Sequence, residues 1–132
     1  MSFRIIQLEN LCVRIEENDN NISLFFNAAL IKKTMDDAVE KTLWKQDGSI
    51  EVRNIRNKIN IGLDTATILG INISYDFYTY KNMLALPFYN KGDIFLSIQF
   101  DKIEKILDIE CSEIEILLAD NPKYIRHIKK ME

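Results

Sequence analysis

The residues with the most reactive side chains in this chain are one histidine and two cysteines, and their spacing assembles no familiar reaction centre. His127 is the only histidine, so a metal site or an acid–base pair made from two histidines of one chain is excluded. Cys12 and Cys111 stand far apart, and neither has another Cys or His at zinc-ligand spacing. We expect two reduced, buried thiols, no metal and no cofactor.

Carboxylates are plentiful, and they gather in the stretch 101–120. Twenty acidic residues face 17 Lys and Arg, for a net charge of -3. The acidic residues of the stretch are Asp101, Glu104, Asp108, Glu110, Glu113, Glu115 and Asp120, against only Lys102 and Lys105. Such a face either pairs with the chain's own cations or steers a basic partner toward it. We select Glu104, Asp108, Glu113 and Glu115 as partner-contact residues. No strand pattern of Asp followed by Glu-x-Lys is present, so a metal-dependent nuclease is not indicated.

The stretch 71–80, INISYDFYTY, alternates like a half-buried strand and then changes character. Its odd positions are apolar, and its even positions are polar as far as Asp76. Tyr78 and Tyr80 then continue the polar side. Exposed tyrosines are frequent interface anchors, so we select Asp76, Tyr78 and Tyr80 as protein-binding residues. The alternative is that a helix or loop covers both rings.

Nucleic-acid binding is the less favoured reading of this stretch. Bases stack on aromatic strands in some RNA-binding sheets, but here Lys81 is the only neighbouring cation. Residues 64–72 resemble the first helix and turn of a helix-turn-helix motif. The second helix of that motif fails, because Asp76 and Thr79 fall where buried apolar residues are needed.

Several segments predict strands. They are 2–9, 11–17, 22–27, 50–52, 59–63, 71–80, 83–89, 94–100 and 113–119, although residues 50–63 also fit helical spacing. The turn residues 18–21 predict a hairpin between the second and third of these. The short connections within 71–100 predict an antiparallel meander.

Three segments predict short helices. Thr34 and the acidic residues after it are typical of a helix start, so a helix over 34–45 would place Trp44 against a sheet. Asp101 with Glu104 resembles a capping box. Asn121-Pro122 is typical of the start of an amphipathic helix over 122–131. We therefore predict an α+β fold, an antiparallel sheet with two or three short helices packed on one face.

The whole chain, 1–132, has the length and composition of a single globular domain. Hydrophobic residues make up 47% and charged residues 28%, and no apolar run reaches the ~18 residues of a membrane span. We expect a cytoplasmic protein of bacterial or phage origin that is not an enzyme and has no membrane partner. Its expected function is protein binding, as an inhibitor or immunity-type protein that neutralises another protein. The alternatives are a homo-oligomeric assembly subunit, or an enzyme or small-ligand binder with an Asp/Glu/Tyr cleft.

Overall fold

The computed structural model describes residues 3–34 and 41–128, and in these ranges the chain forms ten β-strands and no helix. The strands are β1 (Phe3–Gln7), β2 (Leu11–Asn18), β3 (Asn21–Thr34), β4 (Lys41–Arg53), β5 (Thr65–Tyr75), β6 (Tyr78–Lys81), β7 (Met83–Leu86), β8 (Tyr89–Phe100), β9 (Leu107–Leu118) and β10 (Lys123–Ile128). The predicted α+β class is therefore wrong, and the described chain is all-β.

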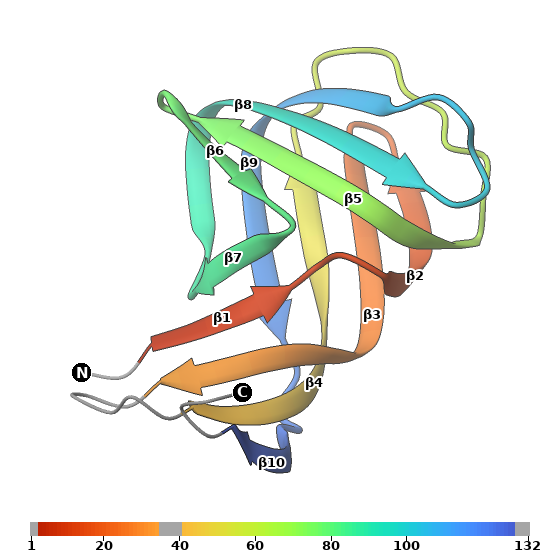
Figure 1. Cartoon of the computed structure of the whole chain (residues 1–132). Coiled ribbons are helices and arrows are strands. Elements are labelled where there is room, and N and C mark those ends of the chain that lie inside the picture. Colours follow the sequence, from red (N-terminus) through yellow and green to blue (C-terminus); the bar gives the residue numbers. More distant parts are fainter. Residues whose placement is uncertain (1–2, 35–40, 129–132) are drawn as a thin grey trace.

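Six strands close into an antiparallel barrel, in the order β2–β3–β4–β9–β8–β5 (Figure 1). The barrel is closed because β2, the first strand of this order, also pairs with β5, the last strand. Strand β4 joins the two halves of the wall by pairing with β3 on one side and with β9 on the other. Alternate side chains along each strand point inward, as the period of two requires. The interior is filled with Ile, Leu, Val and Phe side chains such as Leu24, Ile50 and Phe100, each less than 2% exposed. It is a packed core.

Strands β3 and β4 continue beyond the barrel into a second sheet, which we call the distal sheet. It consists of residues 3–7, 29–34, 41–46, 83–86 and 123–128, in the strand order β7–β1–β3–β4–β10. In Figure 1 these segments lie below the barrel, ending with β10 at the bottom. One face of the distal sheet, with Ile6, Ile31 and Leu84, is buried in the same hydrophobic core as the barrel interior.

A β-bulge in β3 separates the barrel part of the β3–β4 pair from its distal part. The pairing register shifts between Phe26 and Ala29, and Ala28 takes a left-handed conformation with φ of 57°. The Ala28 N–H donates a hydrogen bond to Asp47 Oδ1 (2.7 Å), and Asn121 Nδ2 donates to Asp47 Oδ2 (2.8 Å). These two hydrogen bonds lower the pKa of the Asp47 carboxyl, with the Ala28 N–H as the larger cause.

Gly48 lies beside this bulge at the tightest point of the barrel wall. A Cβ atom there would collide with the Leu117 carbonyl and lie 2.9 Å from the Phe26 ring. Only glycine lets β4 approach β9 and the core this closely.

The three predicted helices are all wrong in the described residues. Residues 41–45 of the predicted helix 34–45 belong to β4, and 35–40 lie outside the described residues. The predicted helix 122–131 contains β10, and 129–131 again lie outside. Trp44 contacts Tyr124 of β10 edge to face, with ring centroids 5.4 Å apart. The prediction that Trp44 packs a helix against a sheet is therefore wrong. Pairing with neighbouring strands overrides the local capping signals.

The predicted capping box at Asp101 and Glu104 forms no helix either. The Asp101 carboxylate accepts a hydrogen bond from the Thr67 N–H (2.9 Å), so it caps β5 instead of its own segment. Residues 101–106 form a connection between β8 and β9.

The hairpin predicted around residues 18–21 is confirmed, because Asn18 pairs with Asn21 between β2 and β3. The predicted meander over 71–100 is wrong. Strand β8 pairs directly with β5, while β7 leaves to pair with β1. Residues 59–63, predicted as a strand, lie in the irregular connection between β4 and β5.

Candidate functional site

The stretch 71–80 is a hairpin of two strands. Asp76 and Phe77 form the turn, both with positive φ (53° and 69°), and Tyr75 pairs with Tyr78 across it. Cross-strand partners share a face of the sheet, so Tyr78 and Tyr80 lie on the same face as Tyr75 and Ile73. The tyrosines therefore extend the apolar face and not, as simple alternation predicted, the polar one.

The two tyrosines differ in burial. Tyr80 is half-buried and contacts Phe88 of the core edge to face, with centroids 5.3 Å apart. Tyr78 leans on Tyr80 at 4.6 Å and remains 61% exposed. Tyr80 is thus a supporting residue, and Tyr78 presents its ring to the outside.

Phe77 is the residue that sequence reasoning missed. It stands at the tip of the hairpin and is fully exposed. Of the seven described non-glycine residues with positive φ, five are Asn or Asp, which tolerate this conformation; only Ala28 and Phe77 do not belong to these types. Alternation assigned Phe77 to a buried face, because Asp-Phe carries no turn signal.

A concavity of about 660 Å³ lies beside the hairpin and opens to its tip. It is lined by residues of the turn and of β8, among them Phe95, which is 50% exposed. Gly92 lets β8 pass under the hairpin, because a Cβ there would lie 3.1 Å from the Tyr75 ring. We call the group Asp76, Phe77, Tyr78, Asp93 and Phe95 the hairpin surface.

The predicted acidic residues do not join this surface as one group. Glu113 and Glu115 lie together on β9, where Arg53 approaches them at 3.6 Å and 3.0 Å. The Tyr89 hydroxyl donates to Glu113 (2.7 Å), and this hydrogen bond raises the pKa of Tyr89. Both carboxylates are therefore engaged within the chain.

The other two predicted acidic residues lie apart. Asp108 on β9 accepts a hydrogen bond from the Ser97 hydroxyl (3.1 Å). Glu104 is exposed in the connection between β8 and β9. Of the predicted contact residues, Asp76, Tyr78 and Tyr80 share one hairpin, whereas Asp108, Glu113 and Glu115 lie on β9.

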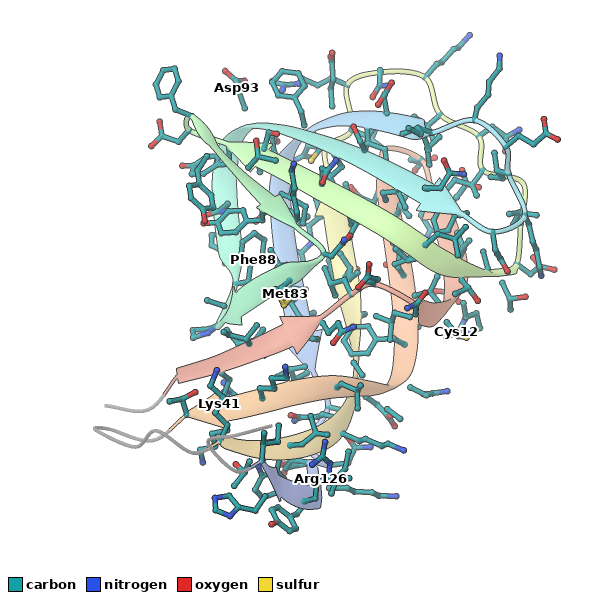
Figure 2. The ribbon with its side chains drawn as sticks, viewed as in Figure 1. Cys12, Lys41, Met83, Phe88, Asp93 and Arg126 are labelled. Carbon is teal, nitrogen blue, oxygen red and sulfur yellow. The ribbon has the colours of Figure 1, made fainter. Side chains whose placement is uncertain are left out.

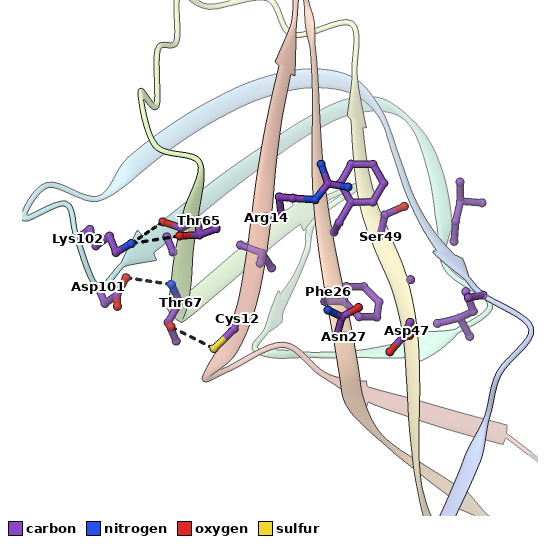
Figure 3. Close-up of a pocket in the computed structure, with 17 residues that line it drawn as sticks. Cys12, Arg14, Phe26, Asn27, Asp47, Ser49, Thr65, Thr67, Asp101 and Lys102 are labelled. Carbon is purple, nitrogen blue, oxygen red and sulfur yellow. Dashed lines mark hydrogen bonds between the residues drawn. The ribbon is translucent and has the colours of Figure 1, made fainter.

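A second concavity, of about 780 Å³, lies on the outer wall of the barrel and crosses five strands. Along its floor, the Arg14 guanidinium sits 4.4 Å from the centre of the Phe25 ring. At one wall the Lys102 ammonium donates to Thr65, and Cys12 Sγ lies 3.4 Å from the Thr67 hydroxyl (Figure 3). No histidine is among its described lining residues, so Cys12 has no base beside it there.

The two cysteines are free and differ in environment. Cys111 is buried as predicted, and burial raises its pKa to about 11. Cys12 is exposed, which corrects the expectation that both thiols are buried.

In the part of the chain that the structure describes, no group of three or more His, Cys, Asp or Glu side chains could hold a metal ion. Nor does any helix there have the length and apolar character of a membrane span.

Comparison with known proteins gives no further guide to this site. No family model, no curated protein and no solved structure matches the chain. Its function must therefore be argued from the geometry of its own residues.

Proposed function

We propose that this chain is a protein-binding module and that the hairpin surface is its primary contact. The observation that carries the proposal is Phe77, a large apolar side chain held fully exposed at a position with positive φ. A turn with two positive φ values favours Asn, Asp and Gly, so folding alone disfavours phenylalanine here. Residues held in such costly conformations cluster at binding and catalytic sites.

The neighbours of Phe77 support a protein partner. Tyr78 and Phe95 add exposed aromatic rings that line the same concavity as Phe77. Aromatic rings bury large areas at low entropic cost, and they are the most frequent anchors in protein interfaces. Tyr80, packed on Phe88, holds the base of the hairpin in place.

The proposal leaves two kinds of partner, both expected from the sequence. In one, the module neutralises a different protein as an inhibitor or immunity-type protein. In the other, the partner is a further copy of the chain, and the protein is an assembly subunit. The hairpin surface would be the anchor in both.

A capture experiment tests the proposal. The tagged chain is expressed in the organism that encodes it, and bound proteins, including untagged copies of the chain, are identified by mass spectrometry. Phe77→Ser with Tyr78→Ser should abolish capture, whereas Ile106→Ser should not. Ile106 is a matched control because it is 59% exposed and lies in the connection between β8 and β9. Capture that survives the double substitution contradicts the proposal.

A further inference from the structure

The charges of this protein are segregated between its two sheets. The described residues of the distal sheet contain seven cations and no Asp or Glu; the cations are Arg4, Lys32, Lys33, Lys41, Lys45, Lys123 and Arg126. The other described residues carry sixteen acidic and eight basic side chains. The sequence between β3 and β4 adds three acids, outside the described residues, and cations remain in excess. The molecule therefore has a basic end and an acidic end.

The outer face of the distal sheet holds an apolar groove of about 220 Å³. Its walls include Ile5, Leu30, Leu43 and Met83, with Lys32 at the edge. Met83 is 52% exposed, and Leu30 is also exposed. Since the inner face of the same sheet is already buried in the core, this sheet is apolar on both faces. Exposed apolar side chains that gather in a groove are typical of a contact with a partner or a ligand.

The groove and the hairpin surface match in size and in the sign of their charge. A cavity of about 150 Å³ lined by apolar side chains is large enough for a benzene ring, so the groove can accept one aromatic ring. The hairpin surface presents such a ring, Phe77, flanked by Asp76 and by Asp93, whose carboxylate also accepts a hydrogen bond from Arg56 (2.8 Å). Asp93 and Arg126, which line the two concavities, lie at opposite ends of the molecule in Figure 2. One copy therefore does not bring its own two surfaces into contact.

We propose that the groove of the distal sheet docks the hairpin surface of a second copy of this chain, in a head-to-tail arrangement. This inference rests on the proposed function, because it uses the hairpin surface as a protein contact. Phe77 of one copy would enter the groove beside Leu30 and Met83 of the next. The acidic flanks of the hairpin would then meet Lys32 and its neighbours.

Other occupants fit these features less well. Pairing two distal sheets with each other would bring cation against cation. A nucleic acid would find cations here, including Lys32 and Arg126 of the groove itself, but no aromatic side chain on which a base could stack is among the described residues that line the groove. A head-to-tail contact is heterologous, so it builds a ring if the rotation closes and a filament if it does not.

Two blocked variants test the arrangement by complementation. The sheet variant is Lys32→Glu with Met83→Asp, both exposed positions in the groove. The hairpin variant is Phe77→Ser with Tyr78→Ser. We expect the wild-type chain to self-associate, and to do so less at high salt, when measured by sedimentation and light scattering. Each variant alone should be a monomer of 15.5 kDa. Their mixture should form a 1:1 dimer and nothing larger, because each supplies the surface that the other lacks.

The outcomes separate this inference from the proposed function. A mixture that stays monomeric, or a wild-type chain that is monomeric up to about 1 mM, overturns head-to-tail docking. If only the hairpin variant blocks association, the docking inference fails and the hairpin surface remains the protein contact. If neither variant blocks it, the docking inference fails, and the capture experiment alone decides the proposed function. Melting temperatures confirm that each variant is folded, and Lys32→Glu alone replaces the sheet variant if the double change unfolds it.

Discussion

Replacing Phe77 with glycine should make the protein more stable and its binding weaker. A left-handed conformation costs an L-residue about 1–2 kcal/mol, and Phe77 has φ of 69°. Glycine removes this cost but adds about 0.5–1 kcal/mol of backbone entropy on folding. The fully exposed ring loses little packing when it is removed. We therefore expect a net gain of about 0.5–1 kcal/mol in the free energy of unfolding.

The gain is measurable as a rise in melting temperature. Unfolding entropy is about 2.1 cal/mol/K per residue, so for 132 residues the expected rise is about 2–4 °C. Calorimetry or thermal circular dichroism would measure it under conditions in which both proteins are monomeric.

The same substitution should weaken association. A phenylalanine ring buried in a contact contributes about 2–3 kcal/mol, so its loss should raise the dissociation constant by about 30- to 150-fold. Titration calorimetry with the captured partner, or sedimentation for self-association, would measure this change.

Asp19→Gly provides the matched control. Asp19 also has positive φ (48°) and stands in the turn between β2 and β3, away from the hairpin surface. Because aspartate tolerates this conformation, the substitution should change stability little and leave association unchanged. A lower melting temperature for Phe77→Gly would show that the ring stabilises the fold. A higher melting temperature with unchanged association would refute the reasoning that the turn is strained for binding.

Three further predictions concern the barrel. Gly48→Ala should destabilise the protein by about 1–3 kcal/mol, measured by urea unfolding, because the added Cβ collides with the Leu117 carbonyl; an unchanged midpoint would contradict the tight approach of β4 to β9. Alkylation of the native protein at neutral pH should label Cys12 and spare the buried Cys111, as peptide mass spectrometry would show. Because burial raises the Cys111 pKa from 9.0 to about 11, the unfolded chain loses this proton first as pH rises. Stability should therefore fall between about pH 9 and pH 11, and Cys111→Ala should remove this component of the pH dependence.

Local sequence patterns predicted strands where one face is buried and the pairing is local. The hairpin of β2 and β3 follows from turn residues between two alternating runs, and the structure confirms it. The same kind of reasoning failed at 41–45 and 123–128, where an apolar spacing compatible with a helix lies in paired strands. Capping signals contribute about 1 kcal/mol, which is less than a strand gains from partners far away in the chain.

At the candidate site, too, local sequence patterns predicted only part of what the structure shows. The sequence indicated the aromatic stretch and selected Asp76, Tyr78 and Tyr80, all of which lie in one hairpin. It did not reveal Phe77, because Asp76 is followed by Phe and not by Gly, which is the usual second residue of such a turn. Phe95 joins the surface only because β8 pairs with β5. Glu113 and Glu115 are engaged by Arg53, which lies on a neighbouring strand more than 50 residues earlier.

The sequence by itself determined the composition of a globular core, the alternation of most strands and the absence of a two-histidine site, because these depend only on residue types and short spacing. Barrel closure, the distal sheet, and the separation of a basic end from an acidic end were decided by tertiary structure alone. They depend on strand pairings such as β3 with β4 and β8 with β5, which join residues distant in the chain and leave no local pattern. The physical reason is that a strand's side-chain period records which face is buried but not which strand lies beside it.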